Sequence, residues 1–186
     1  MTFHLNAAKR VLKYLKGTMN LGLKFSRTDE SIFINGFSDS DWGSGEDCKS
    51  ISGYCFNLQS NGPLISWKSK KQSIVALSSC EAEYVALTHA IQESKFLQQL
   101  LSDILGVVVP ITIGVDNQSA MKLAKNPVFH QRSKHINIKY HFIRNEILNE
   151  NVKLFYVQSI SNIADIFTKP VTSSKLNMFS CIRGID

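Results

Sequence analysis

The chain has 186 residues, of which 21 are lysine or arginine and 15 are aspartate or glutamate, so its formal net charge is +6. Hydrophobic residues make up 44% and charged residues 19%, which is the composition of a globular domain rather than of a disordered chain. No run approaches the roughly 18 apolar residues that a membrane span requires, so we expect no membrane-spanning segment.

The four cysteines, at positions 48, 55, 80 and 181, have neither the spacing of a zinc knuckle nor the density of a disulfide framework. No apolar segment follows the first basic residues, as it would in a secretory signal. We therefore expect reduced thiols and an intracellular location, with a Cys48–Cys55 disulfide as the alternative. The moderate positive charge makes polyanions candidate partners.

The first 30 residues form a basic segment whose first acidic residue is Asp29. Apolar residues recur at helical spacing within it, and Gly17 ends the pattern. They are Ala8, Val11, Leu12 and Leu15. The pattern predicts a short amphipathic helix with three possible roles: a mitochondrial transit peptide, a helix packed on the domain, or an arm that contacts a nucleic-acid backbone.

The remaining sequence predicts an alternation of strands and helices. Three strands come first, at residues 32–38, 53–58 and 64–68, and a turn at 60–63 joins the last two. A long helix at 79–105 follows, with Ser78 or Ser79 as its N-cap. The later elements are a strand at 110–115, helices at 118–125 and 138–148, a strand at 152–157 and a short helix from about 162 to 170. A meander followed by strands reached through helical crossovers predicts an α/β fold, with a five-stranded mixed sheet flanked by helices.

Four acidic residues stand where this layout brings strand ends and helix starts together. Asp39 and Asp116 end two strands, Glu83 lies in the first turn of the long helix, and Asp165 opens the last helix. In open α/β sheets, ligands gather outside the carboxyl ends of the strands. Clustered carboxylates repel one another unless cations bind, and Mg²⁺ takes oxygen ligands. The pattern indicates a two-metal phosphodiester site; the alternative is a set of unrelated helix caps and turns.

Two glutamates lie in the first turn of the long helix, and the apolar stripe of this helix indicates which of them faces the sheet. Stepping back three and four residues from Leu87 and Ala90 leads to Glu83, whereas Glu81 points about 160° away at 100° per residue. We therefore expect Glu83 on the sheet side of the helix. Glu81 is expected to complement the helix dipole.

Several motifs surround these acids. They are GFSDSDW at 36–42, KSISGY at 49–54, ISWKSKKQ at 65–72, ALSSCEAEY at 76–84, VDNQSA at 115–120, NPVFHQRSKH at 126–135, YHFIR at 140–144 and ADIFTKP at 164–170. Colinear from about residue 30 to 170, they resemble the ribonuclease H domain of copia-type retrotransposon polyproteins. AAKRVLKYLKGT at 7–18 resembles the tail of the reverse transcriptase region in the same family, which disfavours the transit peptide.

This resemblance implies a ribonuclease H-like fold and Mg²⁺-dependent cleavage of the RNA strand of RNA–DNA hybrids, with Mn²⁺ as a possible substitute. It assigns four residues as catalytic and as ligands of two metal ions, with Asp41 as an accessory acid. Those four are Asp39, Glu83, Asp116 and Asp165. It divides the chain into a reverse transcriptase remnant at 1–28, a ribonuclease H-like domain at 29–172 and a tail at 173–186. The implied partners are the hybrid and the reverse transcriptase region of the same polyprotein, in cytoplasmic virus-like particles and in the nucleus.

Nucleic-acid contacts are expected from basic and polar residues on several elements, with a merely solvated face as the alternative. These residues are Lys68, Lys70, Lys71, Asn117, Gln118, Arg132, Lys134, His135 and Arg144. His130, His135 and His141 are not spaced to bind zinc. Trp42 and Trp67 are expected in the core rather than stacked on bases.

One departure from the family pattern concerns the last acid. Many cellular ribonucleases H carry a histidine-bearing loop before it, whereas residues 158–162 (QSISN) contain no histidine. Proton transfer would then rely on solvent, and we expect slow turnover. The sequence therefore predicts a hybrid-specific endoribonuclease. The alternatives are a catalytically inactive remnant that folds and binds nucleic acid, and a structural role in a polyprotein particle.

Overall fold

A five-stranded mixed sheet forms the centre of the computed structural model, which describes residues 2–27, 31–59, 62–125 and 134–182. The strand order is β3-β2-β1-β4-β5. The antiparallel strands are β1 (Ile34–Asp41), β2 (Ile51–Leu58) and β3 (Leu64–Lys71). The strands β4 (Ile111–Val115) and β5 (Lys153–Tyr156) continue the sheet in parallel with β1. The predicted α/β fold, with a meander and two parallel strands, is confirmed.

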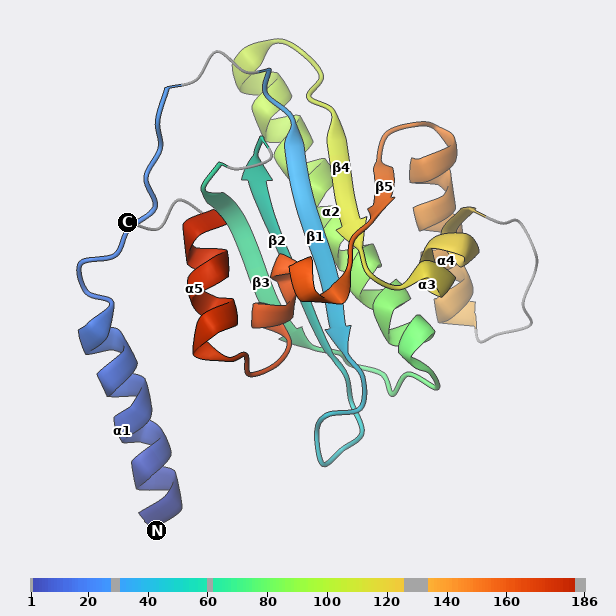
Figure 1. Cartoon of the computed structure of the whole chain (residues 1–186). Helices are drawn as coiled ribbons and strands as arrows, with labels where there is room; N and C mark the ends of the chain where they lie inside the picture. The colour runs from blue at the N-terminus through green and yellow to red at the C-terminus, as the bar shows by residue number, and fades with distance from the viewer. Residues whose placement is uncertain (1, 28–30, 60–61, 126–133, 183–186) are drawn as a thin grey trace.

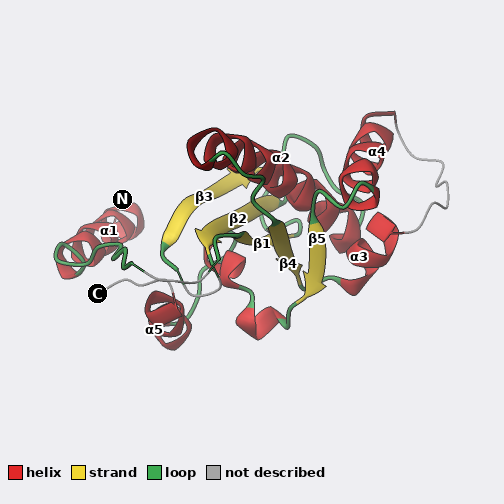
Figure 2. Ribbon diagram, turned by 90° about the horizontal axis from the view of Figure 1, so that it is seen from above, coloured by secondary structure: helices red, strands yellow, loops and turns green. Residues whose placement is uncertain are grey.

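Helices cover both faces of this sheet (Figure 2). One face carries α2 (Ser79–Leu105), with α3 (Gln118–Lys125) and α4 (Lys134–Leu148) packed against it. The opposite face carries the 3-10 helices η1 (Ser159–Ser161) and η2 (Ile163–Phe167) and the helix α5 (Ser173–Ile182). The helix α1 (Thr2–Gly17) stands apart from the sheet in both views, and its apolar side chains are exposed.

Strand alternation divides the buried residues into two cores. On β1, Ile34 belongs to the core beneath α2, where Leu87 and Ile91 are fully buried. Phe37 points to the other face because successive strand side chains alternate, and it packs with the core that contains Ile163 and Phe179. Residues at odd positions of β1, Asp39 among them, therefore face η2, and those at even positions face α2.

The long helix has the predicted ends. Ser78 is its N-cap, with a side chain that accepts a hydrogen bond from the amide of Glu81, and Gly106 closes it in the left-handed region at φ 70°. Other predicted boundaries were wrong. The first strand continues to Asp41, and the expected helix after residue 162 is a 3-10 turn that ends at Phe167. A helix this short has too few periodic residues to be distinguished from an α-helix by its sequence.

The segments outside residues 29–172 contain structure of their own. The α5 helix lies in the predicted tail, and its Phe179 is fully buried beside Ile163. The division at residues 28 and 172 stays a prediction. None of the helices in the described residues is long and apolar enough to span a membrane.

Candidate active site

Three aspartates meet at one end of the sheet. Asp39 lies near the end of β1, Asp116 directly follows β4, and Asp165 lies in η2. Because β1 and β4 are parallel and Ser38 pairs with Val115, the residues that come next, Asp39 and Asp116, stand side by side. One carboxylate oxygen from each of the three aspartates lies within 4.8 Å of the others. The parallel register of β1 and β4 thus brings together two of the four predicted acids, and η2 adds the third.

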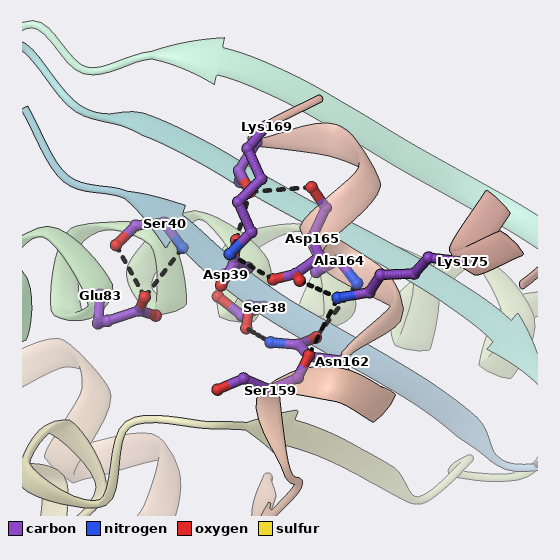
Figure 3. Close-up of polar contacts among 11 residues, drawn as sticks. Ser38, Asp39, Ser40, Glu83, Ser159, Asn162, Ala164, Asp165, Lys169 and Lys175 are labelled. Carbon is purple, nitrogen blue, oxygen red and sulfur yellow. Dashed lines mark hydrogen bonds and ion pairs between the residues drawn. The ribbon is translucent and has the colours of Figure 1, made fainter. Parts of the chain in front are cut away.

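The η2 turn is attached to the sheet by a buried asparagine. Asn162 donates through Nδ2 to the carbonyl of Ser38, at 3.0 Å, and accepts through Oδ1 from the amide of Ala164, at 3.1 Å (Figure 3). It therefore caps the turn that carries Asp165 and binds that turn to the residue before Asp39. Thr168, just beyond η2, donates its hydroxyl to Oδ2 of Asp39.

The close packing of η2 on β2 depends on Gly53, which pairs with Asp39 across the sheet. A Cβ at this position would lie 2.7 Å from Cγ2 of Thr168 and 3.1 Å from the carbonyl oxygen of Ala164. The first distance is shorter than real Cβ contacts, and the second is tighter than most of them. The missing side chain of Gly53 thus allows η2 to bring Asp165 down to Asp39.

Glu83 approaches from the other side, in the first turn of α2. Its Oε1 accepts hydrogen bonds from the amide of Ser40, at 3.0 Å, and from the Ser40 hydroxyl, at 2.9 Å (Figure 3). Its Oε2 is buried and accepts no hydrogen bond from the described residues. Burial first, and then the charges of Asp39 and Asp116, raise the pKa of Glu83 well above its usual range, although the Ser40 hydrogen bonds oppose this.

Glu81, which was expected to complement the helix dipole, is buried and hydrogen-bonds the backbone at the start of α2. Its carboxylate accepts from the amide of Leu77, at 2.9 Å, while Ser78 accepts from the amide of Glu81. The pair differs from a capping box in that Glu81 accepts from the amide of Leu77, one residue before the N-cap. The stripe therefore separated the two glutamates correctly by side.

Two lysines supply positive charge to the aspartates. Nζ of Lys169 lies 2.9 Å from Oδ1 of Asp165 and 4.0 Å from Oδ2 of Asp39. Lys175, on α5, pairs with Oδ2 of Asp165 and donates to the carbonyl of Ser159 (Figure 3). Burial lowers the pKa of Lys169, but the hydrogen bond to Asp165 and the surrounding carboxylates outweigh it and raise the pKa overall.

Burial dominates the electrostatics of Asp39, whose side chain is almost wholly enclosed. It raises the pKa of Asp39 from 3.8 to about 6, against the Thr168 hydrogen bond and the charge of Lys169. The charges of Asp165 and Asp116 act in the same direction as burial. An acid in this position is hard to ionise without a further cation.

These donors fit a divalent cation. The cluster offers only carboxylate oxygens, which hard cations such as Mg²⁺ prefer. Glu83 provides a fourth carboxylate near the cluster, because the charges of Asp39 and Asp116 contribute to its raised pKa. Its Oε2 has no hydrogen-bond partner among the described residues. Asp41, expected as an accessory acid, is partly exposed and is not one of the three grouped aspartates.

Comparisons with known proteins agree with this geometry. No family model matches the chain. It is 38% identical over 184 residues to the "Retrovirus-related Pol polyprotein from transposon RE1" of Arabidopsis thaliana, which covers 98% of the chain and 12% of that polyprotein. It is 37% identical over 183 residues to the corresponding protein of transposon TNT 1-94 of Nicotiana tabacum, covering 98% of the chain and 14% of the relative. The chain is a homologue of copia-type retrotransposon Pol polyproteins.

Solved structures identify the fold. LC11-RNase H1 matches with a TM-score of 0.55 at 16% identity, over 73% of this chain and 92% of that one. A foamy viral protease-reverse transcriptase, solved with an RNA/DNA hybrid, matches with a TM-score of 0.51 at 12% identity, over 79% of this chain and 22% of that one. The predicted resemblance to a ribonuclease H domain of a retrotransposon polyprotein is thus confirmed. The solved structures share its fold, and the polyproteins are its relatives in sequence. The chain spans only about an eighth of the first two polyproteins' length.

The residues expected to contact nucleic acid do not all lie on one surface. Lys68, Lys70 and Lys71 are exposed on β3, but Lys71 is paired with Asp47 at 2.8 Å. Asn117 caps α3 by accepting from the amide of Ala120, and Gln118 next to it is exposed. These contacts stay predictions.

The other four residues of that set are harder to place. Arg144 is half-buried near Tyr84. Burial raises the pKa of Tyr84, and the charge of Arg144 opposes this with a smaller effect. Arg132 and the side chains of Lys134 and His135 lie outside the described part of the chain. Their predicted contacts with nucleic acid are therefore untested.

Two further expectations were wrong. Trp42 and Trp67 are each 53% exposed rather than buried, and the indole of Trp42 donates to the carbonyl of Ala76 at 2.9 Å. Trp67 lies on β3, an edge strand, where fewer neighbours cover each side chain. The alternative of a Cys48–Cys55 disulfide is also excluded, because the structure forms no disulfide between these two cysteines.

The residues that organise the acids were not predicted from the sequence. Ser40, Asn162, Thr168, Lys169 and Lys175 all contact an acid or its support, and none was assigned a role. The one available signal was position, because Thr168 and Lys169 belong to the same motif as Asp165. Lys175 had no signal, since its contact depends on the packing of α5.

Proposed function

We propose that this chain hydrolyses the RNA strand of RNA–DNA hybrids, using two bound divalent cations. The observation that carries the proposal is the group of three aspartates within 4.8 Å, with Glu83 beside it, on a ribonuclease H-like sheet. Kinship with Pol polyproteins, which include retrotransposon proteins of plants and yeast, supports the same activity. Mg²⁺ is the proposed ion, with Mn²⁺ as a substitute, because oxygen ligands alone do not distinguish them.

In this mechanism the chain holds four carboxylates at fixed positions. Asp39, Asp116 and Asp165 would ligate the cations together with Glu83. When bound, such ions activate a water molecule and stabilise the charge on the attacking and leaving oxygens of the phosphodiester. Water adds to phosphorus, the bond to the 3′ oxygen breaks, and the products end in a 5′-phosphate and a 3′-hydroxyl.

The protein contributes rigidity and charge. Ser40 fixes one oxygen of Glu83, and Asn162 fixes the turn that carries Asp165, so neither acid needs to reorganise when cations enter. Lys169 and Lys175 neutralise Asp165 beforehand and would exchange contacts with an entering cation. Because residues 158–162 supply no histidine, proton transfer would rely on solvent, and turnover would be slow.

The proposed partners are the hybrid and the reverse transcriptase region of the same polyprotein. The exposed apolar side chains of α1 support the second partner, because an amphipathic helix without a packing surface is costly in water. They include Val11, Leu12 and Leu15. We place the activity in cytoplasmic virus-like particles and in the nucleus.

A second candidate is a folded, nucleic-acid-binding remnant without activity. The contacts of Lys169 and Lys175 with Asp165 favour it, because they allow the cluster to fold without any metal. Salt-dependent binding of the hybrid without cation-dependent cutting would support this candidate over the first.

Cleavage of an end-labelled RNA–DNA hybrid by the purified chain tests the proposal. Reactions with Mg²⁺ and with EDTA, and with single-stranded RNA and duplex DNA as substrates, would run beside the variants Asp39→Asn and Asp116→Asn. We expect cleavage of the RNA strand of the hybrid alone, lost in EDTA and in both variants. A folded wild type as inert as its variants would refute the nuclease.

A further inference from the structure

A cavity of about 300 Å³ opens on the face of the sheet that α2 covers, and none of the three aspartates lines it. Its floor consists of Ser52 and Tyr54 of β2, and its rim carries Lys68 and Lys70 of β3. These four residues share one face because Ser52 pairs with Lys70 and Tyr54 pairs with Lys68. The opposite wall is a short stretch of α2 that begins at His89.

The cavity concentrates positive charge that the protein leaves unpaired. Lys68 and Lys70 are exposed, and neither forms an ion pair within the described residues. Burial, followed by the charges of Lys139, Lys70 and Lys68, lowers the pKa of His89. Three lysines from β3 and α4 therefore act on one histidine of α2, which places a positive potential inside the cavity.

The polar groups that line the cavity can donate hydrogen bonds. Ser52 accepts from Nε2 of Gln72 at 2.9 Å, which leaves its own hydroxyl hydrogen to donate. Gln92 adds an amide from α2. The acidic residue of the wall, Glu93, is already engaged.

Glu93 accepts on both of its oxygens. The Tyr54 hydroxyl donates to one at 3.1 Å, and the Ser66 hydroxyl donates to the other at 2.6 Å. These two hydrogen bonds hold the carboxylate against β2 and β3; it keeps its negative charge but forms no ion pair with Lys68 or Lys70. A cavity with several donors and unpaired cations suits an anion with several acceptor oxygens.

The cavity lies at the same end of the sheet as the proposed active site. Ser40, which holds Glu83, pairs with Ser52, and Ser52 pairs with Lys70, so one row crosses three strands. Neighbouring strands are about 4.8 Å apart, which puts the backbone of Lys70 about 10 Å from that of Ser40. Since the axial rise of duplex DNA is about 3.4 Å per nucleotide, two sites this far apart lie within a few nucleotides of each other.

We infer that this cavity binds a phosphate group of the nucleic-acid backbone, a few nucleotides from the phosphodiester at the acid cluster. This inference rests on the proposed function for the identity of the nucleic acid. It extends that function by assigning Ser52, His89 and Gln92, which join Lys68 and Lys70 as one site. Contacts of this kind position a nucleic acid without reading its bases.

Binding measured without cleavage tests the inference. Fluorescence anisotropy of a labelled hybrid in EDTA, over a range of salt concentrations, would compare wild type with the double variant Lys68→Ala/Lys70→Ala. The matched control is Lys122→Ala/Lys153→Ala, which removes two exposed lysines that lie outside both the cavity and α1. We expect the cavity variant to lose about tenfold in affinity and to lower the slope of log affinity against log salt by about 1 to 2, equally for hybrid and duplex DNA. An unchanged slope, or the same loss in the control, would overturn the site.

A second measurement uses inorganic phosphate alone. NMR titration should shift the imidazole resonances of His89 and raise its pKa in wild type, and both effects should disappear in Lys68→Ala/Lys70→Ala. Phosphate binding without any effect on nucleic-acid affinity would identify a free-phosphate site and refute the backbone contact. Neither assay measures cleavage. A wild type that fails to cut hybrids would therefore refute the nuclease, while the phosphate site would still be decided by the two binding measurements.

Discussion

Nζ of Lys169 lies 2.9 Å from Oδ1 of Asp165, four residues earlier in the chain. The same ammonium lies 4.0 Å from Oδ2 of Asp39, so one cation from the chain contacts two of the three clustered aspartates. Lys175 provides a second cation from the other side of Asp165. The metal-free cluster is therefore partly neutralised by the chain itself, and any divalent ion must compete with these lysines.

The first prediction concerns that competition. Lys169→Ala removes the ion pair and leaves Asp165 and Asp39 less compensated. In EDTA we expect the free energy of unfolding to fall by about 1 to 2 kcal/mol. This is less than the loss expected for a fully buried ion pair, because the Lys169 side chain is 40% exposed and solvent screens its charge. Mg²⁺ should then stabilise the variant more than it stabilises wild type.

Urea unfolding with EDTA and with Mg²⁺ measures both effects. Lys122→Ala, which removes an exposed lysine of α3, is the control and should change neither value appreciably. Equal gains from Mg²⁺ in wild type and in Lys169→Ala would contradict competition between the lysine and the ion.

The second prediction is a pH dependence caused by Asp39. The pKa of Asp39 is raised from its usual value of 3.8 to about 6 in the folded protein. Between these two pH values the folded state therefore binds more protons than the unfolded state. The stability that this group contributes is full below about pH 4 and is lost as the pH rises through about 6, by roughly 3 kcal/mol at most. We therefore expect the metal-free protein to lose stability between pH 4 and pH 6.

Asp39→Asn removes this titration, because an amide carries no proton to lose. Urea unfolding in EDTA across this pH range should show a smaller fall for the variant than for wild type. Adding Mg²⁺ at pH 7 should restore stability to wild type alone. Parallel pH profiles for the two proteins would show that Asp39 titrates normally.

The meeting of three of the acids was predictable from the sequence because strand and helix ends determine where they lie. Asp39 and Asp116 follow from two parallel strands, and the apolar stripe of α2 distinguished Glu83 from Glu81. The groups around the acids were not predictable in the same way. Asn162 donates to a carbonyl 124 residues away, and Lys175 depends on where α5 packs. Such contacts arise from tertiary packing, which has no periodic signal in the sequence.

The third prediction separates the two glutamates of α2. Glu83→Gln keeps the shape of the side chain but removes a charge beside the aspartates, so we expect hybrid cleavage to fall by at least about 100-fold. Glu81→Gln weakens the hydrogen bond from the amide of Leu77 at the start of α2, and it should cost about 1 kcal/mol of stability while cleavage stays near that of wild type. Cleavage rates and urea unfolding on both variants give the comparison. Equal loss of cleavage in the two variants would refute the assignment of Glu83.

The fourth prediction concerns the glycine beneath η2. In Gly53→Ala, the new methyl group would lie 2.7 Å from Cγ2 of Thr168 and 3.0 Å from Cβ of Phe167, so η2 must move away from β2. We expect a loss of about 1 to 3 kcal/mol in stability from overpacking. Displacement of the turn also separates Asp165 from Asp39, and a shift of about 1 Å in a catalytic group costs on the order of 100-fold in rate.

Gly17→Ala is the matched control, because a Cβ at the end of α1 has no heavy atom within 4 Å. It should leave cleavage unchanged. Thermal unfolding at increasing Mg²⁺ concentration adds a readout independent of cleavage: the displaced Asp165 should shift the midpoint of stabilisation by Mg²⁺ to higher concentration in Gly53→Ala. If Gly53→Ala binds Mg²⁺ and cuts the hybrid like wild type, the position of η2 on the sheet does not determine the geometry of the acids. The acids would then owe their arrangement to the register of β1 and β4 and to the Asn162 contact with Ser38.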